Sequence, residues 1–238
     1  VMEQRTKLIK GMIDREMMRA NRGNRDPIYI AWDEYNVWYR ARGGNFARGT
    51  NALEERYNLE DALVIGGFLN GFVRNADVVK MANMAQLVNV IKGSFKQTIY
   101  YPLQLFAQNM HGKSLDVFVD CETYDTEKFF IGLGEQTTQQ KDVPYLDVSA
   151  AINNGELIIA VINRHKDKAI STDILLQEGS FDGNFKVYEV NAPDVKAEND
   201  FNTEKVVTKE KTPINAKGQK VTYSFPAHSF TLLKGKIK

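Results

Sequence analysis

Residues 28–39, IYIAWDEYNVWY, place two adjacent carboxylates directly after a hydrophobic run. Aromatic residues follow Asp33 and Glu34 almost without interruption. Enzymes that hydrolyse glycosidic bonds use one carboxyl group to protonate the leaving oxygen and another to attack the anomeric carbon or activate water. Aromatic rings suit the apolar faces of sugars, so the stretch indicates a sugar-processing site. The alternative is a salt-bridged strand end beside a packed aromatic core.

Strand geometry limits what this carboxylate pair can do. Successive side chains of a strand point to opposite faces, so Asp33 and Glu34 are not expected to face one pocket together. We therefore expect one of them to face a reacting centre and the other to support the strand end or a neighbouring loop. They are not the acid and the base of one site.

Composition and charge exclude several classes of protein. The chain has 238 residues, 43% hydrophobic, with 31 basic and 30 acidic side chains, which is typical of a globular protein. A net charge of +1 does not predict binding to nucleic acid or to an anionic membrane. The single cysteine, Cys121, excludes an internal disulfide and fits a reducing compartment. The sequence contains no run of about 18 apolar residues, so no transmembrane helix is predicted.

The first half of the chain has the pattern of an α/β protein. A helical apolar stripe runs over residues 2–20, and a short buried strand, PIYIAWDE, follows Pro27. Asn58 is expected to be the N-cap of a second helix, which runs through DALVIGGFLNGFVRNA. Its three glycines, at positions 66, 67 and 71, are expected to allow close helix packing. A strand is expected at Val78–Met84. A strand–helix–strand unit with long loops after its strands is the repeat of a β/α barrel.

The second half reads as short strands separated by turn signals, which indicates an antiparallel sandwich. The predicted strands are SLDVFVDCETY, VPYLDVSAAI, ELIIAVINRH, DILLQEG, NFKVYEV, KVTYSFP and SFTLLKGKI. The polar stretch from Asn191 to Lys220 is predicted to be a long surface loop. A domain boundary is expected near residue 112, and without a proline- or serine-rich linker the two parts should pack tightly.

The stretch WDEYNVWY resembles the nucleophile strand of glycoside hydrolase family 51, the α-L-arabinofuranosidases. That family usually has Asp-Glu-Trp-Asn-Val-Trp, and this chain has Tyr35 at the first tryptophan. The resemblance continues in order through YNLEDALVIGGFLN, AQLVNVI, QTIYYP, VPYLDVSAA, AVINRH and FPAHSFTLL. It implies the C-terminal half of the enzyme: strands seven and eight of a (β/α)8 barrel at residues 1–112, then a jelly-roll-like antiparallel β-sandwich at residues 113–238.

The resemblance also implies roles for single residues. Glu34 matches the nucleophile of a retaining reaction, in which the two catalytic carboxylates lie about 5–5.5 Å apart. Trp38 matches an aromatic wall of the arabinose pocket, with core packing as the alternative. Gln86 matches a side chain that hydrogen-bonds a sugar hydroxyl, with a buried amide bonded to backbone as the alternative. Asp33 and Asn36 are expected to support the strand end.

One large departure from the family concerns its acid/base residue. Its acid/base glutamate follows an asparagine, and this chain contains no Asn-Glu dipeptide. Two strands cannot close a barrel, so hydrophobic faces are expected to be exposed. We therefore expect a C-terminal piece of a split, cleaved or truncated enzyme that needs the N-terminal half of the same enzyme as its partner.

The implied activity is release of terminal α-L-arabinofuranosyl residues from arabinan, arabinoxylan or derived oligosaccharides. A β-xylosidase or endoglucanase on the same frame stays open, as does a non-catalytic fragment whose sandwich stabilises an assembly or binds carbohydrate. No metal or organic cofactor is implied, and His111, His165 and His228 share no metal-ligand spacing. The family further implies a cytoplasmic homo-oligomer.

Overall fold

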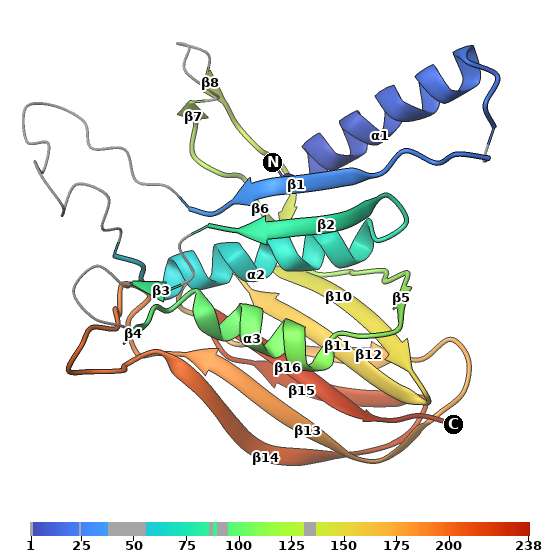
Figure 1. The fold of residues 1–238 in the computed structure, drawn as a ribbon. Helices are drawn as coiled ribbons and strands as arrows, with labels where there is room; N and C mark the ends of the chain where they lie inside the picture. Colours follow the sequence, from blue (N-terminus) through green and yellow to red (C-terminus); the bar gives the residue numbers. More distant parts are fainter. Residues whose placement is uncertain (1, 24, 38–55, 86–87, 90–94, 131–136) are drawn as a thin grey trace, which may run out of the picture.

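The computed structural model describes residues 2–23, 25–37, 56–85, 88–89, 95–130 and 137–238. Its elements form layers: the β1–β2 pair lies over the helices α2 and α3, and these lie over a six-stranded sheet (Figure 1). A second pair of strands, β12 and β15, lies against the far side of that sheet, because their side chains join its core. The described structure therefore has four layers: the β1–β2 pair, the helices α2 and α3, the six-stranded sheet and the β12–β15 pair.

The N-terminal elements form a strand–helix–strand unit. They are α1 (Met2–Arg19), β1 (Ile30–Tyr35), α2 (Leu59–Arg74), β2 (Val79–Met84), β3 (Val88–Asn89), β4 (Phe95–Lys96) and α3 (Tyr100–Asn109). Strands β1 and β2 pair in parallel, and α2 connects them. The predicted first helix, the strand near Val78–Met84 and the strand–helix–strand unit are thus confirmed, whereas α3 was not predicted.

Asn58 is the N-cap of α2, as the sequence predicted, and it forms a capping box with Asp61. The Asp61 backbone N–H donates to Asn58 Oδ1 at 3.3 Å, and the Asn58 N–H donates to Asp61 Oδ2 at 2.8 Å. Both bonds satisfy N–H groups that a helix start leaves without intrahelical partners. The local sequence supplies this cap, and the N–H groups of Leu59 and Glu60 donate to the carbonyls of Ala197 and Val195.

Gly66 of α2 allows close packing against the sheet, as predicted, whereas a Cβ on Gly67 or Gly71 would make only ordinary van der Waals contacts. A Cβ atom on Gly66 would lie 3.1 Å from Ile162 Cδ1 of the six-stranded sheet, and one on Gly71 would lie 3.6 Å from Glu3 Cβ of α1. The helix therefore lies directly on the sheet with α1 beside it. This contact also confirms that the two halves of the chain pack tightly.

The second half of the chain is an antiparallel β-sandwich, as predicted. Its strands are β5 (Lys113–Leu115), β6 (Thr123–Tyr124), β7 (Phe129–Phe130), β8 (Thr137–Thr138), β9 (Val143–Pro144), β10 (Leu146–Asn153), β11 (Glu156–Asn163), β12 (Ile170–Leu175), β13 (Phe181–Asn191), β14 (Val207–Gly218), β15 (Lys220–Phe225) and β16 (Ser229–Lys236). The six-stranded sheet has the order β14-β13-β16-β11-β10-β5, and its neighbours pair antiparallel. The boundary after residue 112 stays a prediction; β5 is the first strand along the chain to join this sheet.

Strand β11 is buried on both faces. Its even-numbered residues from Ile158 to Ile162 belong to the core shared with α2 and α3. Its odd-numbered residues from Leu157 to Val161 belong to the core between the sheet and the β12–β15 pair. Because a strand turns alternate side chains to opposite faces, burial of both faces explains its uninterrupted hydrophobic run.

The predicted strand SLDVFVDCETY is wrong over most of its length. Only its ends are strands, β5 and β6, and no strand is assigned to residues 116–122. Val117, Val119 and Cys121 still pack against the inter-sheet core, whereas Phe118 between them is 88% exposed. Hydrophobic residues alternate along this stretch, but a strand also needs a hydrogen-bonded neighbour, and the described residues supply none for residues 116–121.

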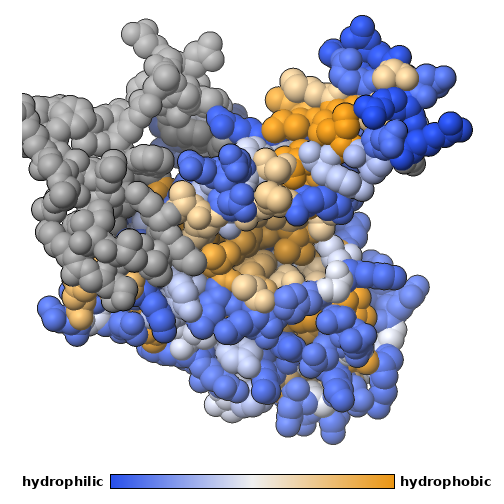
Figure 2. Space-filling model, in the orientation of Figure 1, coloured by the Kyte–Doolittle hydropathy of each residue, from blue (hydrophilic) through white to orange (hydrophobic). Residues whose placement is uncertain are grey.

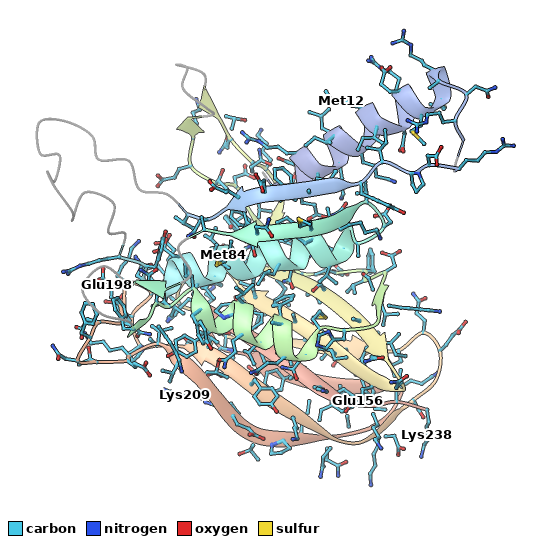
Figure 3. All side chains as sticks on the ribbon, in the orientation of Figure 1. Met12, Met84, Glu156, Glu198, Lys209 and Lys238 are labelled. Atoms are coloured by element: carbon cyan, nitrogen blue, oxygen red, sulfur yellow. The ribbon has the colours of Figure 1, made fainter. Side chains whose placement is uncertain are left out.

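The predicted surface loop from Asn191 to Lys220 is also wrong over part of its length. Strand β14 occupies Val207–Gly218 and pairs with β13, so the connection is residues 192–206. Strand β14 is the edge of the sheet and exposes most of its side chains, among them Lys209 (Figure 3). An edge strand with polar residues on both faces has the composition of a loop, which is why the sequence pattern misled.

Hydrophobic side chains are exposed mainly on α1, whereas the prediction concerned the faces of the two barrel strands, of which Met81 is an exposed member. On α1, Leu8 is 60%, Met12 54% and Met18 75% exposed, and Met81 of β2 is 54% exposed. Figure 2 shows hydrophobic surface from α1 towards the region of α2. Among the described residues, no helix is long and apolar enough to cross a membrane.

Candidate active site

The carboxyl end of β1 lies on an aromatic floor supplied by α2. The Tyr35 ring packs edge-on against Phe68 and Phe72, with ring centroids 6.3 and 5.1 Å apart. Trp32 contacts Phe72 from the same strand, at 6.5 Å between centroids. Tyr35 is 4% exposed, and burial raises the pKa of its phenol to about 12. The floor therefore fixes the strand end by packing, with Tyr35 as a neutral ring.

Asp33 and Glu34 stand at this strand end, and both are exposed. The register with β2 shifts here: Trp32 is opposite Ala82, and Tyr35 is opposite Met84. Asp33 and Glu34 of β1 therefore lie opposite the single residue Asn83 of β2. We expected the Asp33 and Glu34 side chains to point to opposite faces because we assumed a regular strand, and the strand is irregular at these two residues. Bulges of this kind re-aim side chains and are frequent beside active sites.

Asn36 joins the carboxyl ends of the two parallel strands. Its Nδ2 donates to the Ala85 carbonyl at 2.5 Å and to Tyr57 Oη at 3.0 Å. The Ala85 N–H in turn donates to the Tyr35 carbonyl at 3.4 Å. The carboxyl ends of β1 and β2 therefore form one connected edge, and in barrels this edge carries the active site.

Two predicted site residues cannot be placed. Trp38 and Gln86 lie outside the described residues. The described chain reaches Val37 after β1 and Ala85 after β2, next to Met84, which is labelled in Figure 3. Of the predicted site residues, the structure thus brings together Asp33, Glu34 and Asn36 at one edge.

Sequence analysis missed a buried ionic cluster that connects α1 and α2 to the six-stranded sheet. Asp147, with 5% of its side chain exposed, accepts hydrogen bonds from Arg74 Nη1 at 2.7 Å, from Asn70 Nδ2 at 3.1 Å and from Arg164. Arg74 also forms an ion pair with Glu3 of α1 at 2.6 Å. Burial raises the pKa of Glu3, but this guanidinium and the Lys7 ammonium together outweigh it, so the net shift is downward.

This cluster lies beside a cleft of about 680 Å³ between α1, α2 and the sandwich. Its charges are paired with one another, which is typical of a structural contact. The sequence did contain one indication of this cluster: Asp147 and Arg164 lie in VPYLDVSAA and AVINRH, two of the segments that carry the family resemblance.

The two histidines of the sandwich, His165 and His228, make structural contacts. The ring nitrogens of His228 contact the carbonyls of Lys166 and Ala192 at 2.5 and 3.0 Å. The ring of His165 lies against Tyr145, with centroids 4.7 Å apart. Within the described ranges, no group of three or more metal-ligating side chains is arranged to hold a metal ion.

Comparison with known proteins identifies related sequences. A family model described as "Alpha-L-arabinofuranosidase C-terminal domain" matches residues 33–229. The chain is 39% identical over 217 residues to a probable α-L-arabinofuranosidase C of Aspergillus clavatus, covering 88% of this chain and 40% of that protein. It is 30% identical over 213 residues to the intracellular exo-α-(1→5)-L-arabinofuranosidase 1 of Bacillus subtilis, covering 81% and 39%.

Solved structures show the same fold. An α-L-arabinofuranosidase of Thermotoga maritima in complex with arabinose matches with a TM-score of 0.81 and 25% identity, over 98% of this chain and 47% of that one. A family 51 α-L-arabinofuranosidase of Thermotoga petrophila matches with a TM-score of 0.80 and 27% identity, over the same shares. The fold is thus that of the C-terminal part of these enzymes, a barrel portion followed by a β-sandwich. The chain spans less than half the length of these relatives.

Proposed function

The chain belongs to the α-L-arabinofuranosidase C-terminal domain family, and from this premise we propose that it supplies the nucleophile of a retaining α-L-arabinofuranosidase. The carrying observation is the exposed Glu34 at the carboxyl end of a parallel strand, within the matched residues 33–229. The substrate would be a terminal α-L-arabinofuranosyl residue of an arabinan- or arabinoxylan-type saccharide, consistent with the names of the relatives.

In the proposed reaction, a Glu34 carboxylate oxygen bonds to the anomeric carbon while the bond from that carbon to the leaving oxygen breaks. A carboxylic acid from outside this chain gives its proton to the leaving oxygen. The same group, now a carboxylate, takes a proton from water as the water oxygen attacks the anomeric carbon. The ester bond to Glu34 breaks, and arabinose leaves with retained configuration. Asn36 and the aromatic floor keep the strand end in place.

The rest of the site would come from the N-terminal part of the same enzyme. The relatives are more than twice as long as the matched chain, and exposed hydrophobic side chains on α1 and β2 offer a surface for that part. An intracellular enzyme is proposed because the Bacillus subtilis relative is named as one. A homo-oligomer is a proposal from the family resemblance alone.

The test is hydrolysis of an aryl α-L-arabinofuranoside by this chain assembled with its N-terminal part. Glu34→Gln keeps the shape of the side chain and removes the nucleophile, so kcat should fall by at least about 10³-fold. Glu178→Gln is the matched control, because Glu178 is an exposed carboxylate of the sandwich, between β12 and β13. It should keep full activity.

Three outcomes would contradict the proposal. An active Glu34→Gln enzyme would show that another residue is the nucleophile. Hydrolysis of an aryl β-xyloside or a β-glucan in place of the arabinofuranoside would indicate a different glycosidase. An assembled, folded protein without glycosidase activity would indicate a structural or carbohydrate-binding role for the sandwich.

A further inference from the structure

A tyrosine next to the start of α2 reaches the carboxyl end of β1. Tyr57 Oη accepts a hydrogen bond from Asn36 Nδ2 at 3.0 Å. Asn36 stands two residues after Glu34 and directly after β1, whereas Tyr57 directly precedes Asn58, the N-cap of α2. The bond therefore connects the strand end that carries the candidate nucleophile to the start of the helix that lies against it.

The side-chain amide of Asn36 is held in one orientation. Its Oδ1 accepts the Val37 N–H at 2.8 Å, and its Nδ2 donates to the Ala85 carbonyl and to Tyr57 Oη. Because Oδ1 faces an N–H donor and Nδ2 faces a carbonyl acceptor, a rotation of the amide by 180° would lose both bonds. The Tyr57 oxygen is therefore an acceptor here, and it occupies the second N–H of the amide.

The bonds of Asn36 also reach the residue that follows Glu34. The Ala85 carbonyl accepts from Asn36 Nδ2, and the Ala85 N–H donates to the Tyr35 carbonyl at 3.4 Å. The Tyr35 ring packs edge-on against two phenylalanine rings of α2. Glu34 therefore directly precedes a residue that is held by its ring and by its carbonyl group, and the Asn36 amide completes this attachment.

Tyr57 is itself fixed by the core and by its neighbours along the chain. It is 3% exposed and belongs to the core that α2 and α3 share with the six-stranded sheet. The carbonyl of the next residue, Asn58, accepts a hydrogen bond from Oγ1 of the buried Thr98 at 2.7 Å. Asn58 also forms a β-bridge with Glu198 of the 192–206 loop, which Figure 3 shows beside the start of α2. The Tyr57 hydroxyl is thus a fixed point for the strand end.

We propose that Tyr57 is a positioning residue of the candidate active site, acting through Asn36 on the strand end that carries Glu34. The inference rests on the proposed function. Without the hydroxyl, one N–H of the Asn36 amide loses its acceptor, and fewer bonds hold the strand end. Glu34 bonds to the anomeric carbon only in the chemical step, so a displaced strand end lowers kcat and leaves KM nearly unchanged.

The experiment compares Tyr57→Phe with Tyr223→Phe in the complete enzyme. Tyr57→Phe keeps the buried ring and removes only the hydroxyl that Asn36 contacts. For an aryl α-L-arabinofuranoside, kcat should fall by on the order of 10-fold in this variant, with KM within about 2-fold. Tyr223→Phe is the matched control, because Tyr223 lies on β15, in the layer at the opposite side of the fold from β1. It should leave both constants unchanged.

A second substitution tests whether Tyr57 acts through Asn36. Asn36→Ala removes the same hydrogen bond from its other end, together with the bond to Ala85. If the two residues act as one unit, Tyr57→Phe should lower kcat no further in the Asn36→Ala background. A general structural effect would not give this result, because the effects of independent substitutions add. Should Tyr57→Phe not fold, Asn36→Ala tests the same bond: a lower kcat with unchanged KM supports the proposal, and an unchanged kcat overturns it.

Failure of this inference and failure of the proposed function are distinguishable. An active wild type with an unchanged kcat in Tyr57→Phe would overturn the role of Tyr57, as would a further fall in kcat in the Asn36→Ala background. Both results would leave the proposed function intact. A wild type that releases no arabinose would overturn the proposed function. In that case, amide hydrogen exchange of residues 30–37 still decides: faster exchange in Tyr57→Phe than in Tyr223→Phe supports positioning, and equal exchange overturns it.

Discussion

At the scale of single residues, Glu34 and Asp147 show two uses of a carboxylate. Glu34 is exposed at a strand end, where a substrate can reach it. Asp147 is buried and faces two guanidinium groups, so its charge serves the contact between α2 and the sheet. Sequence motifs draw attention to both, but burial and partners separate the candidate catalytic group from the structural one.

The pH dependence of stability should report the Glu3–Arg74 ion pair. The pKa of Glu3 in the folded state is below its ordinary value of 4.5, so its contribution is present above pH 4.5 and is lost as the pH falls through the lowered pKa. Glu3→Gln should therefore flatten the fall in the free energy of unfolding below about pH 4.5. Urea unfolding of the complete enzyme from pH 3 to pH 7 measures this. An unchanged slope, equal to that of Glu178→Gln, would contradict it.

At the scale of elements, α2 was the most predictable part of the chain. Its N-cap Asn58 and its Gly66 are local features, and each has the predicted consequence. The element boundaries that failed, residues 116–122 and β14, depend on neighbours far away in the sequence. A strand needs a partner, and local alternation or polarity does not tell whether one is present.

Two neighbouring glycines of α2 should respond differently to alanine. A Cβ on Gly67 would make ordinary contacts at 3.9 Å, so Gly67→Ala should raise the free energy of unfolding by about 0.4–1 kcal/mol. A Cβ on Gly66 would lie 3.1 Å from the Cδ1 atom of the buried Ile162, so crowding should cancel or reverse this gain. Denaturant unfolding of both variants compares them directly. An equal increase in the free energy of unfolding for both variants would show that the Ile162 side chain moves aside without loss of stability.

At the scale of the whole molecule, the sandwich buries its hydrophobic side chains on both faces of its sheet, whereas the barrel portion leaves several hydrophobic side chains exposed. Strand β11 is covered on both sides, and α2 and α3 contribute to one of its two cores. Strands β1 and β2 form a two-stranded sheet, and the helix before them, α1, exposes Leu8, Met12 and Met18. Large exposed hydrophobic side chains favour association with another surface.

The isolated chain should therefore self-associate, and its N-terminal part should prevent this. Sedimentation velocity at micromolar concentration measures the effect directly. The expected result is a broad distribution of oligomers for the chain alone and one defined species after the N-terminal part is added. Substitution of Met12 by Glu should reduce the self-association, because it places a charge on the exposed face of α1. A monodisperse monomer of the chain alone would contradict the expectation.

The sequence by itself determined the strand–helix–strand unit, the start of α2 and the location of the carboxylate pair at a strand end. These depend on hydrophobic periodicity, capping residues and order along the chain, which are local properties. Only the tertiary structure decided the register shift at Asp33 and Glu34, the two-sided burial of β11 and the bond between Asn36 and Tyr57. Each of these joins residues far apart in the sequence, and short-range pattern contains no information about which distant segments meet.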